Sequence, residues 1–171
     1  MKSFENKVAA ITGAGSGIGR ALALGLARQG CHVALSDVNS AGLKETAELV
    51  RKLGVKASEA LVNVADRDAV QAWADQVMAE YGQVNAIFNN AGVAQGGTVE
   101  GNDYADYEWV MSINFWGVVN GTKAFLPYLK SSGEGHIVNT SSIFGLFAQP
   151  GMSAYNASKF AVRGFTESLR Q

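Results

Sequence analysis

The stretch "ITGAGSGIGRAL" (residues 11–22) contains three glycines spaced as G-x-x-x-G-x-G, and it lies between two different apolar patterns. Residues 7–12 form the short apolar run of a buried strand, and residues 18–30 have the apolar spacing of a helix that stops at Gly30. Glycine permits a tight turn and a close approach of the backbone to a diphosphate, and a helix N-terminus attracts anions. The spacing alone is weak, but its position at the first strand-to-helix turn predicts a dinucleotide-binding loop. The loop residues expected to contact the ligand are Gly13, Ser16, Gly17, Ile18 and Gly19.

Strands and helices alternate along the rest of the chain. Further strands are predicted over residues 32–37, 56–64, 85–90 and 135–142, and further helices over residues 40–54, 66–82, 104–133 and 153–171. Strands that alternate with helices pair in parallel and are covered on both faces. The predicted fold class is therefore α/β, a doubly wound parallel sheet. No linker or low-complexity tract interrupts the pattern, so we expect one domain comprising residues 1–171.

The composition is that of an ordinary globular protein, with 47% hydrophobic and 17% charged residues and a formal net charge of −1. The 14 Lys and Arg residues are scattered among 15 Asp and Glu residues, so no nucleic-acid partner is predicted. No apolar run has signal-peptide character or approaches the ~20 residues that span a bilayer, so we expect no membrane association and a cytoplasmic location. The single cysteine, Cys31, is expected in the core, and neither His32 nor His136 has the spacing of a metal ligand.

Asp37 is the last residue of the second predicted strand, eighteen residues after Gly19. An acidic side chain at this position can accept hydrogen bonds from the adenosine ribose hydroxyls of a dinucleotide. NADP needs a cation near its 2′-phosphate, whereas Ser16 lies in the loop and Val38 follows the aspartate, so NAD is predicted over NADP. The alternative is that Asp37 only caps the helix that starts at Ser40 or solvates a turn.

Six motifs follow one another along the chain. They are "TGAGSGIG" after the first strand, Asp37 after the second, "NNAG" (residues 89–92) after the fourth, Asn114 in the long helix, "SS" (residues 141–142) after the fifth, and "YNASK" (residues 155–159). Together they resemble the short-chain dehydrogenase/reductase family over essentially the whole chain. The resemblance implies a Rossmann fold and an NAD(H)-dependent oxidoreductase that transfers hydride between nicotinamide and a secondary alcohol or ketone.

Members of that family continue past the last helix with further strands and with a loop that covers the substrate. This chain ends in "FTESLRQ" without a helix stop signal, so we expect it to be C-terminally incomplete relative to the family. Without the family's last strands, an apolar edge of the sheet is expected to be exposed. The alternative function is that of a non-catalytic dinucleotide-binding module or a fragment of a longer dehydrogenase.

Tyr155 and Lys159 lie at positions i and i+4 of a predicted helix, so the phenol and the ammonium share one face. A nearby cation favours the ionised form of a phenol, which allows the tyrosine to act as a general acid or base. In the family the catalytic serine lies thirteen residues before the tyrosine, which selects Ser142 to hold the substrate oxygen and leaves Ser141 as the alternative. The resemblance also assigns Asn114 to a water beside the lysine in a proton relay, with a structural kink as its alternative role.

Two further segments resemble cofactor-binding residues of the family. The resemblance places Asn90 and Gly92 nearest the nicotinamide ribose, which the tyrosine and the lysine also contact. After the third strand the family usually has an aspartate near the adenine amino group, whereas this chain has Asn63 and Val64. An amide oxygen can accept the same hydrogen bond, so we expect both residues to contact the cofactor.

Two groups of apolar residues each have two interpretations. Three aromatic side chains of the long helix either pack in the core or, as the resemblance implies, contact a second subunit in a homo-oligomer, a dimer or a tetramer: Trp109, Phe115 and Trp116. Three side chains after the fifth strand either line a hydrophobic pocket for a small alcohol or carbonyl substrate or belong to the core: Phe144, Phe147 and Met152.

Overall fold

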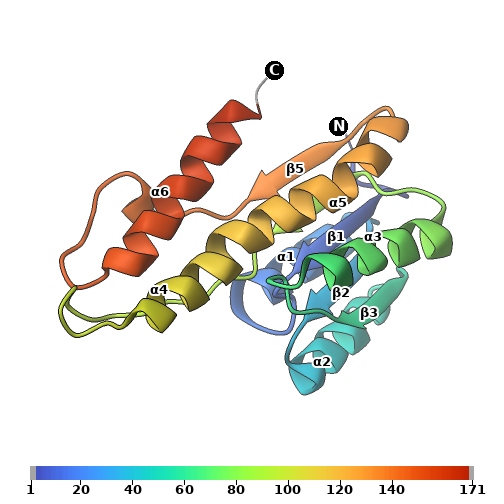
Figure 1. Ribbon diagram of the computed structural model, residues 1–171. Coiled ribbons are helices and arrows are strands. Elements are labelled where there is room, and N and C mark those ends of the chain that lie inside the picture. The colour runs from blue at the N-terminus through green and yellow to red at the C-terminus, as the bar shows by residue number, and fades with distance from the viewer. Residues whose placement is uncertain (1–2, 170–171) are drawn as a thin grey trace.

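The computed structural model describes residues 3–169 and contains a five-stranded sheet in the order β3-β2-β1-β4-β5 (Figure 1). The strands are β1 (Val8–Thr12), β2 (His32–Asp37), β3 (Ala57–Leu61), β4 (Ala86–Asn89) and β5 (His136–Asn139). All the strand pairs are parallel. The strand order changes direction between β1 and β4, so the carboxyl ends of these two strands form the switch point of the sheet. The predicted doubly wound α/β sheet is confirmed.

Helices cover both faces of this sheet (Figure 1). On one face lie α1 (Gly17–Ala27) and α2 (Ser40–Arg51). On the other face lie α3 (Arg67–Tyr81) and α5 (Gly117–Ser131). The remaining two helices, α4 (Tyr104–Met111) and α6 (Ser153–Ser168), lie beside each other beyond the carboxyl ends of the strands.

The core lies on both sides of β1, whose five residues are all buried. Successive side chains of a strand point to opposite faces of the sheet. Val8 and Ala10 therefore pack in the cluster with α3 and α5, whereas Ala9 and Ile11 pack in the cluster with α1 and α2. A continuous apolar run is required of a strand that is covered on both faces, and β1 has one.

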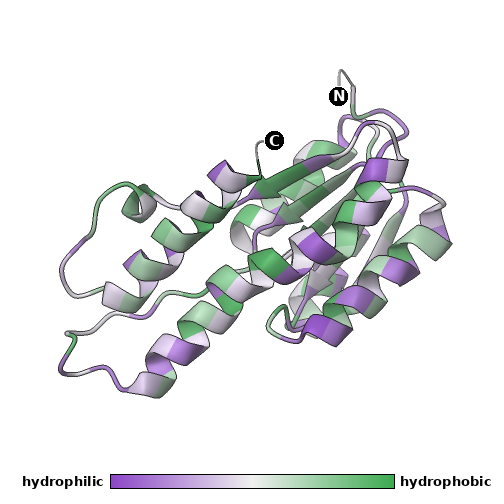
Figure 2. Ribbon diagram, turned by 45° about the horizontal axis from the view of Figure 1, so that its top comes forward, coloured by the Kyte–Doolittle hydropathy of each residue, from purple (hydrophilic) through white to green (hydrophobic). Residues whose placement is uncertain are grey.

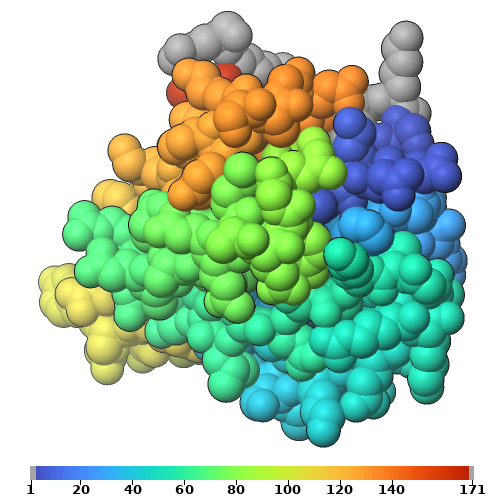
Figure 3. Space-filling view, turned by 90° about the vertical axis from the view of Figure 1, so that its right-hand side faces the viewer, coloured from blue at the N-terminus to red at the C-terminus, as the bar shows by residue number. Residues whose placement is uncertain are grey.

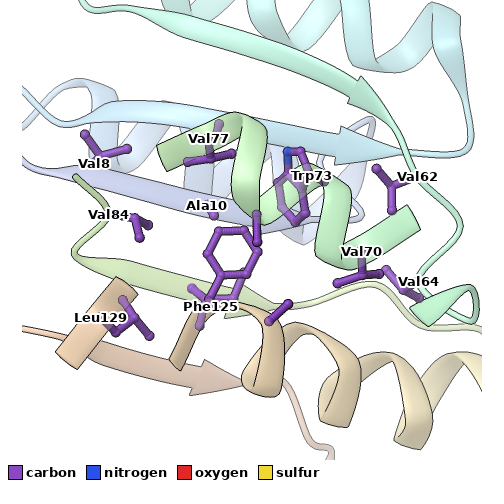
Figure 4. Close-up of a cluster of buried hydrophobic side chains, with 14 residues drawn as sticks. Val8, Ala10, Val62, Val64, Val70, Trp73, Val77, Val84, Phe125 and Leu129 are labelled. Carbon is purple, nitrogen blue, oxygen red and sulfur yellow. The ribbon is translucent and has the colours of Figure 1, made fainter. Parts of the chain in front are cut away.

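Helix α3 begins and ends as its sequence predicts. The Asp66 side chain accepts hydrogen bonds from two backbone N–H groups of the first turn, and Gly82 ends the helix with φ 72°. The buried face of α3 carries Trp73, whose ring packs edge-to-face on Phe125 of α5 with the ring centroids 5.0 Å apart (Figure 4). Phe125 is fully buried, and burying such a side chain contributes about 1.5–3 kcal/mol.

The single long helix predicted over residues 104–133 is wrong in one respect. A π-helical turn, η1 (Ser112–Trp116), separates α4 from α5. A π turn admits one extra residue into a helix, and apolar spacing does not register so small a shift. Two predicted strands are also too long, because β3 ends at Leu61 and β5 at Asn139, and the residues that follow form loops at the carboxyl edge.

Strand β5 forms one edge of the sheet, and Figure 2 shows its apolar residues there. Val138 lies opposite Phe88 of β4 in the parallel register. Its relative exposure is 42%, whereas that of Phe88 is 8%. The expected exposure of an apolar sheet edge is therefore confirmed.

Three segments meet on the side of the molecule where the strands begin (Figure 3). There the loop after α3, in light green, lies between the N-terminal segment, in blue, and the end of α5, in orange. Gln83 Nε2 donates a hydrogen bond to the Asn6 carbonyl (3.1 Å), and Lys7 pairs with Glu134 (3.1 Å).

Among residues 3–169, no helix has both the length and the apolar character needed to cross a membrane.

Candidate active site

Thr12 joins the carboxyl ends of β1 and β4 at the switch point of the sheet. Its Oγ1 accepts hydrogen bonds from the backbone N–H groups of Asn90 (2.9 Å) and Ala91 (3.0 Å), and the Asn90 side chain donates to the Thr12 carbonyl (3.1 Å). A cavity of about 490 Å³ opens beside these bonds. Ten of the predicted site residues line it: Gly13, Ser16, Gly17, Ile18, Gly19, Asn90, Gly92, Ser142, Tyr155 and Lys159.

A second cavity, of about 140 Å³, adjoins the first because Gly13 and Gly92 line both. The predicted residues Asp37, Asn63 and Val64 line this second cavity. The Asn63 Oδ1 atom accepts a hydrogen bond from a backbone N–H two residues later (3.1 Å), and a carbonyl oxygen has a second lone pair for another donor. The two cavities together form a cleft along the carboxyl ends of the strands, where open α/β sheets bind their ligands.

The glycine loop leaves no room for side chains at two of its predicted positions. A Cβ atom on Gly13 would lie 2.8 Å from Ala91 Cα, and Gly13 has φ 66°. A Cβ atom on Gly19 would overlap the Gly13 carbonyl oxygen. Glycine at these positions lets the loop fold back against β4 and brings the N-terminus of α1 to the cleft.

The Asp37 carboxylate holds two backbone groups. Its Oδ2 accepts a hydrogen bond from the Gly15 N–H (2.8 Å), and its Oδ1 accepts one from the Asn39 N–H (2.9 Å). The side chain that caps α2 is Asn39, which accepts from the Gly42 N–H, so the alternative that Asp37 caps this helix is wrong. The bond to Asn39 does stabilise the turn after β2, and each carboxylate oxygen keeps a lone pair for a donor in the cleft.

Tyr155 and Lys159 lie on one face of α6, as their spacing predicts. Lys159 is 4% exposed, and its Nζ atom donates to the Thr140 carbonyl (3.0 Å) and lies 5.5 Å from the centroid of the Tyr155 ring. Burial lowers the pKa of the Lys159 ammonium below its ordinary value, because the low-dielectric interior disfavours the charged form. A Cβ atom on Gly92 would lie 3.6 Å from this Nζ atom, so glycine leaves the ammonium close to the cleft.

The two serines after β5 make different hydrogen bonds. Ser141 Oγ donates its proton to the Lys159 carbonyl (3.1 Å), which ties the loop to α6. Ser142 Oγ accepts from the Phe144 N–H (3.2 Å), so its own proton remains available to a ligand in the cleft. This geometry favours Ser142 over Ser141 as the serine that donates to a substrate oxygen.

Asn114 lies in the π turn and is fully buried. Its side chain accepts a hydrogen bond from the Val93 N–H (2.8 Å) and donates to the Val93 carbonyl (2.9 Å) and to Ser158 Oγ (3.0 Å). Ser158 Oγ in turn donates to the Tyr155 carbonyl (2.7 Å). The structural alternative for Asn114 is therefore present, because it joins the π turn to the loop after β4 and to α6, and its role in a relay water stays a prediction.

Several aromatic side chains lie outside the core. Trp109 and Trp116 are 45% and 54% exposed, so the prediction of core packing is wrong for both. Phe115 is half-buried, with its ring 6.3 Å from that of Phe165. The core alternative is also wrong for Phe147, which is 52% exposed, whereas the Phe144 ring packs edge-on between Phe147 and Tyr155. Met152 is half-buried and lies directly before α6.

Cys31 is fully buried, as predicted. Burial raises the pKa of its thiol to about 12, so the thiolate is not formed near neutral pH. Within residues 3–169 there is no group of three or more His, Cys, Asp and Glu side chains that could hold a metal ion.

Sequence reasoning missed three residues that organise the site: Thr12, Thr140 and Ser158. Thr12 directly precedes the glycine loop, and that position was the available signal. Thr140, directly after β5, contacts both α6 and the segment after β4, since its carbonyl accepts from Lys159 and its hydroxyl lies 3.4 Å from Asn90 Oδ1. The contacts of Thr140 with Asn90 and Lys159, and that of Ser158 with Asn114, join residues distant in sequence, which one sequence does not reveal.

A parallel sheet with a glycine loop at its switch point defines this protein as a member of the Rossmann-type α/β class. The model of the family described as short chain dehydrogenase matches residues 7–171, so the chain belongs to that family of oxidoreductases. It is 58% identical over 171 residues to a Mycobacterium tuberculosis protein named as an oxidoreductase, SadH, covering 100% of this chain and 62% of the relative. The chain therefore spans about three fifths of that relative's length.

Solved structures of the family superpose closely on this chain. A short-chain dehydrogenase/reductase from Burkholderia phymatum in complex with NAD has a TM-score of 0.96 at 42% identity, covering 99% of this chain and 60% of that one. A NAD⁺-bound xylitol dehydrogenase has a TM-score of 0.94 at 36% identity, covering 98% of this chain and 65% of that one.

Proposed function

We propose that this protein is an NAD(H)-dependent oxidoreductase that interconverts a secondary alcohol and a ketone. The observation that carries the proposal is that Ser142, Tyr155 and Lys159 line the same cavity as the glycine loop. A proton-transferring group and a phosphate-binding loop on one cleft are what hydride transfer to a dinucleotide requires. We further propose that residues 1–171 act as one nucleotide-binding domain.

The residues of the cleft fit a dinucleotide. Gly13 and Gly19 have no space for a Cβ atom, and the N-terminus of α1 supplies N–H groups and a dipole that suit a diphosphate. The Asp37 carboxylate beside the second cavity suits two ribose hydroxyls and repels a 2′-phosphate, which favours NAD over NADP. Asn63 and Val64 then lie next to the adenine, and Asn90 and Gly92 next to the nicotinamide ribose.

When bound, NAD supplies the nicotinamide ring that accepts a hydride from the carbinol carbon, or returns one to the ketone. Ser142 donates its hydroxyl proton to the substrate oxygen and stabilises the charge that develops there. Tyr155 takes the hydroxyl proton in oxidation and returns it in reduction, and the Lys159 ammonium stabilises the phenolate. Asn114 positions α6 through Ser158, and we propose that it also supports the relay that returns the proton to solvent.

The first experiment is the substitution Tyr155→Phe. We expect turnover of secondary alcohols with NAD, followed as NADH absorbance, to fall at least about 100-fold, because the general acid and base is lost. NADH affinity, measured by fluorescence titration, should change little, since the ring stays in place. Tyr128→Phe removes a hydroxyl that bonds Asp75 on the surface between α3 and α5, and it should leave turnover unchanged.

Turnover by Tyr155→Phe and turnover by the wild-type chain together distinguish the proposed activity from the alternative function. Turnover retained by Tyr155→Phe would exclude this tyrosine as the proton-transferring residue. A wild-type chain that binds NADH but oxidises none of a broad set of secondary alcohols would support the alternative, a dinucleotide-binding module or a fragment of a longer dehydrogenase.

A further inference from the structure

Arg20 is the residue directly after the glycine loop, and its guanidinium group makes several polar contacts that no sequence motif predicted. It lies in the first turn of α1, and its side chain reaches across to α2. The guanidinium Nη2 atom donates to the Gly15 carbonyl (2.7 Å) and contacts Glu45 Oε2 (2.7 Å), and the Nε atom donates to Thr46 Oγ1 (2.9 Å). Thr46 is fully buried, so one end of this contact set is anchored in the core.

Gly15 is held on both sides by charged groups. The Asp37 carboxylate accepts the Gly15 N–H, and the Arg20 guanidinium donates to the Gly15 carbonyl. The packing around Gly15 leaves no room for a side chain, because a Cβ atom on Gly15 would lie 2.9 Å from Asp37 Oδ2 and one on Gly42 would lie 2.6 Å from the Gly15 carbonyl oxygen. The loop is therefore clamped between the turn after β2 and the start of α2.

This clamp connects the two halves of the cleft. The glycine loop lines the larger cavity and Asp37 lines the smaller one, whereas neither Arg20 nor Gly15 lines either cavity. Arg20 thus contacts the loop without lining either cavity. Its effect on a ligand must pass through the position of the loop relative to the Asp37 carboxylate.

We propose that Arg20 is a positioning residue of the dinucleotide site, an inference that rests on the proposed function. By holding Gly15, it sets the distance between the diphosphate-binding loop and the ribose-binding carboxylate. A preorganised loop binds more tightly because less ordering is needed on binding. Arg20 therefore raises the affinity for NAD(H) and NADP(H) by the same factor, and the choice between them stays with Asp37.

The test is to titrate NADH and NADPH by fluorescence into wild-type protein and variants. Arg20→Gln should raise both dissociation constants by about tenfold, the scale of a lost charge-assisted hydrogen bond, and leave their ratio unchanged. Arg20→Lys keeps a cation that can reach one acceptor, and it should recover part of the affinity. Asp37→Ala serves as the contrast, since it should change the ratio.

Arg51 provides the matched control, because its guanidinium also bonds one backbone carbonyl, that of Ala57 (2.7 Å), and one glutamate, Glu59 (2.8 Å). These contacts are remote from the glycine loop, so Arg51→Gln should bind NADH as wild type does. Circular dichroism establishes folding, and if Arg20→Gln does not fold, the comparison rests on Arg20→Lys.

Unchanged NADH affinity in a folded Arg20 variant overturns the inference, as does a shifted ratio between NADH and NADPH. A wild-type chain without NADH affinity overturns the proposed function itself, and this result is obtained before any variant is measured.

Discussion

At the scale of single residues, the site contains one side chain, that of Lys159, whose burial lowers the free energy of unfolding. Lys159 is a cation that is 4% exposed; its Nζ atom donates a hydrogen bond to the Thr140 carbonyl, and within residues 3–169 it forms no ion pair with a carboxylate. Burying an unpaired charge is costly, and burial lowers the pKa of this ammonium. Burial of this ammonium destabilises the folded protein, which agrees with the proposal that Lys159 stabilises the phenolate of Tyr155.

Lys159→Met should therefore stabilise the protein while turnover is lost. Replacing a buried charge by an apolar side chain of similar length should add about 1 kcal/mol to the free energy of unfolding at pH 7, or about 2–4 °C in melting temperature. A melting temperature below that of wild type would contradict this view of Lys159.

The pH dependence of that difference has a definite sign. The pKa of Lys159 in the folded protein lies below its ordinary 10.5, so the folded state binds fewer protons between these two values. Burial of Lys159 thus does not destabilise the folded state above pH 10.5. The destabilisation grows as the pH falls from 10.5 and is complete below the lowered pKa. The advantage of Lys159→Met should be largest near neutral pH and should shrink in melts recorded at rising pH.

At the scale of elements, some helix glycines are required because the helix packs closely against a strand, and others are not. Gly121 of α5 faces β4, and a Cβ atom on it would overlap the buried Asn89 Oδ1 atom. Gly25 of α1 has no atom within 4 Å of a Cβ position. Glycine therefore has a packing role at position 121 and none at position 25.

Two alanine substitutions test this difference. Gly25→Ala should raise the free energy of unfolding by about 0.5–1 kcal/mol through helix propensity. Gly121→Ala gains the same propensity but should lower stability by about 1–3 kcal/mol, because α5 must move away from β4. Urea denaturation measures both, and equal effects of the two substitutions would show that α5 adapts without strain.

At the scale of the whole molecule, apolar side chains are exposed along α4, η1 and α6, which pack side by side. Those with the largest exposed fractions are Tyr104, Trp109, Trp116 and Phe160. Apolar surface of this kind commonly marks an interface between proteins. We propose that a second copy of the chain covers this face, in a homo-oligomer.

Light scattering tests the oligomeric state. The wild-type mass should be a multiple of 18.0 kDa, and Trp116→Glu should shift it towards the monomer, because a buried charge would be placed at the interface. Leu61→Glu is the control, since Leu61 is 65% exposed on β3 at the opposite edge of the sheet. A wild-type mass of 18.0 kDa would exclude the homo-oligomer.

Local spacing in the sequence determined much of this protein. The order of strands and helices, the glycine loop after β1 and the shared face of Tyr155 and Lys159 all depend on residues a few positions apart, whose geometry the backbone sets. The fold class, the glycine loop and the Tyr155–Lys159 pair were predictable for this reason, whereas the family resemblance was needed to predict Asn63, Val64, Asn90, Gly92 and Ser142.

Only the tertiary structure decided which groups are occupied by other contacts. Ser141 and Ser142 are adjacent in sequence, yet packing against α6 engages the proton of Ser141 and leaves that of Ser142 available. The clamp on Gly15 joins Arg20 and Asp37, which different elements bring together. The physical reason is that hydrogen bonds between distant residues depend on how the elements pack, and the spacing of residues along one chain does not contain that information.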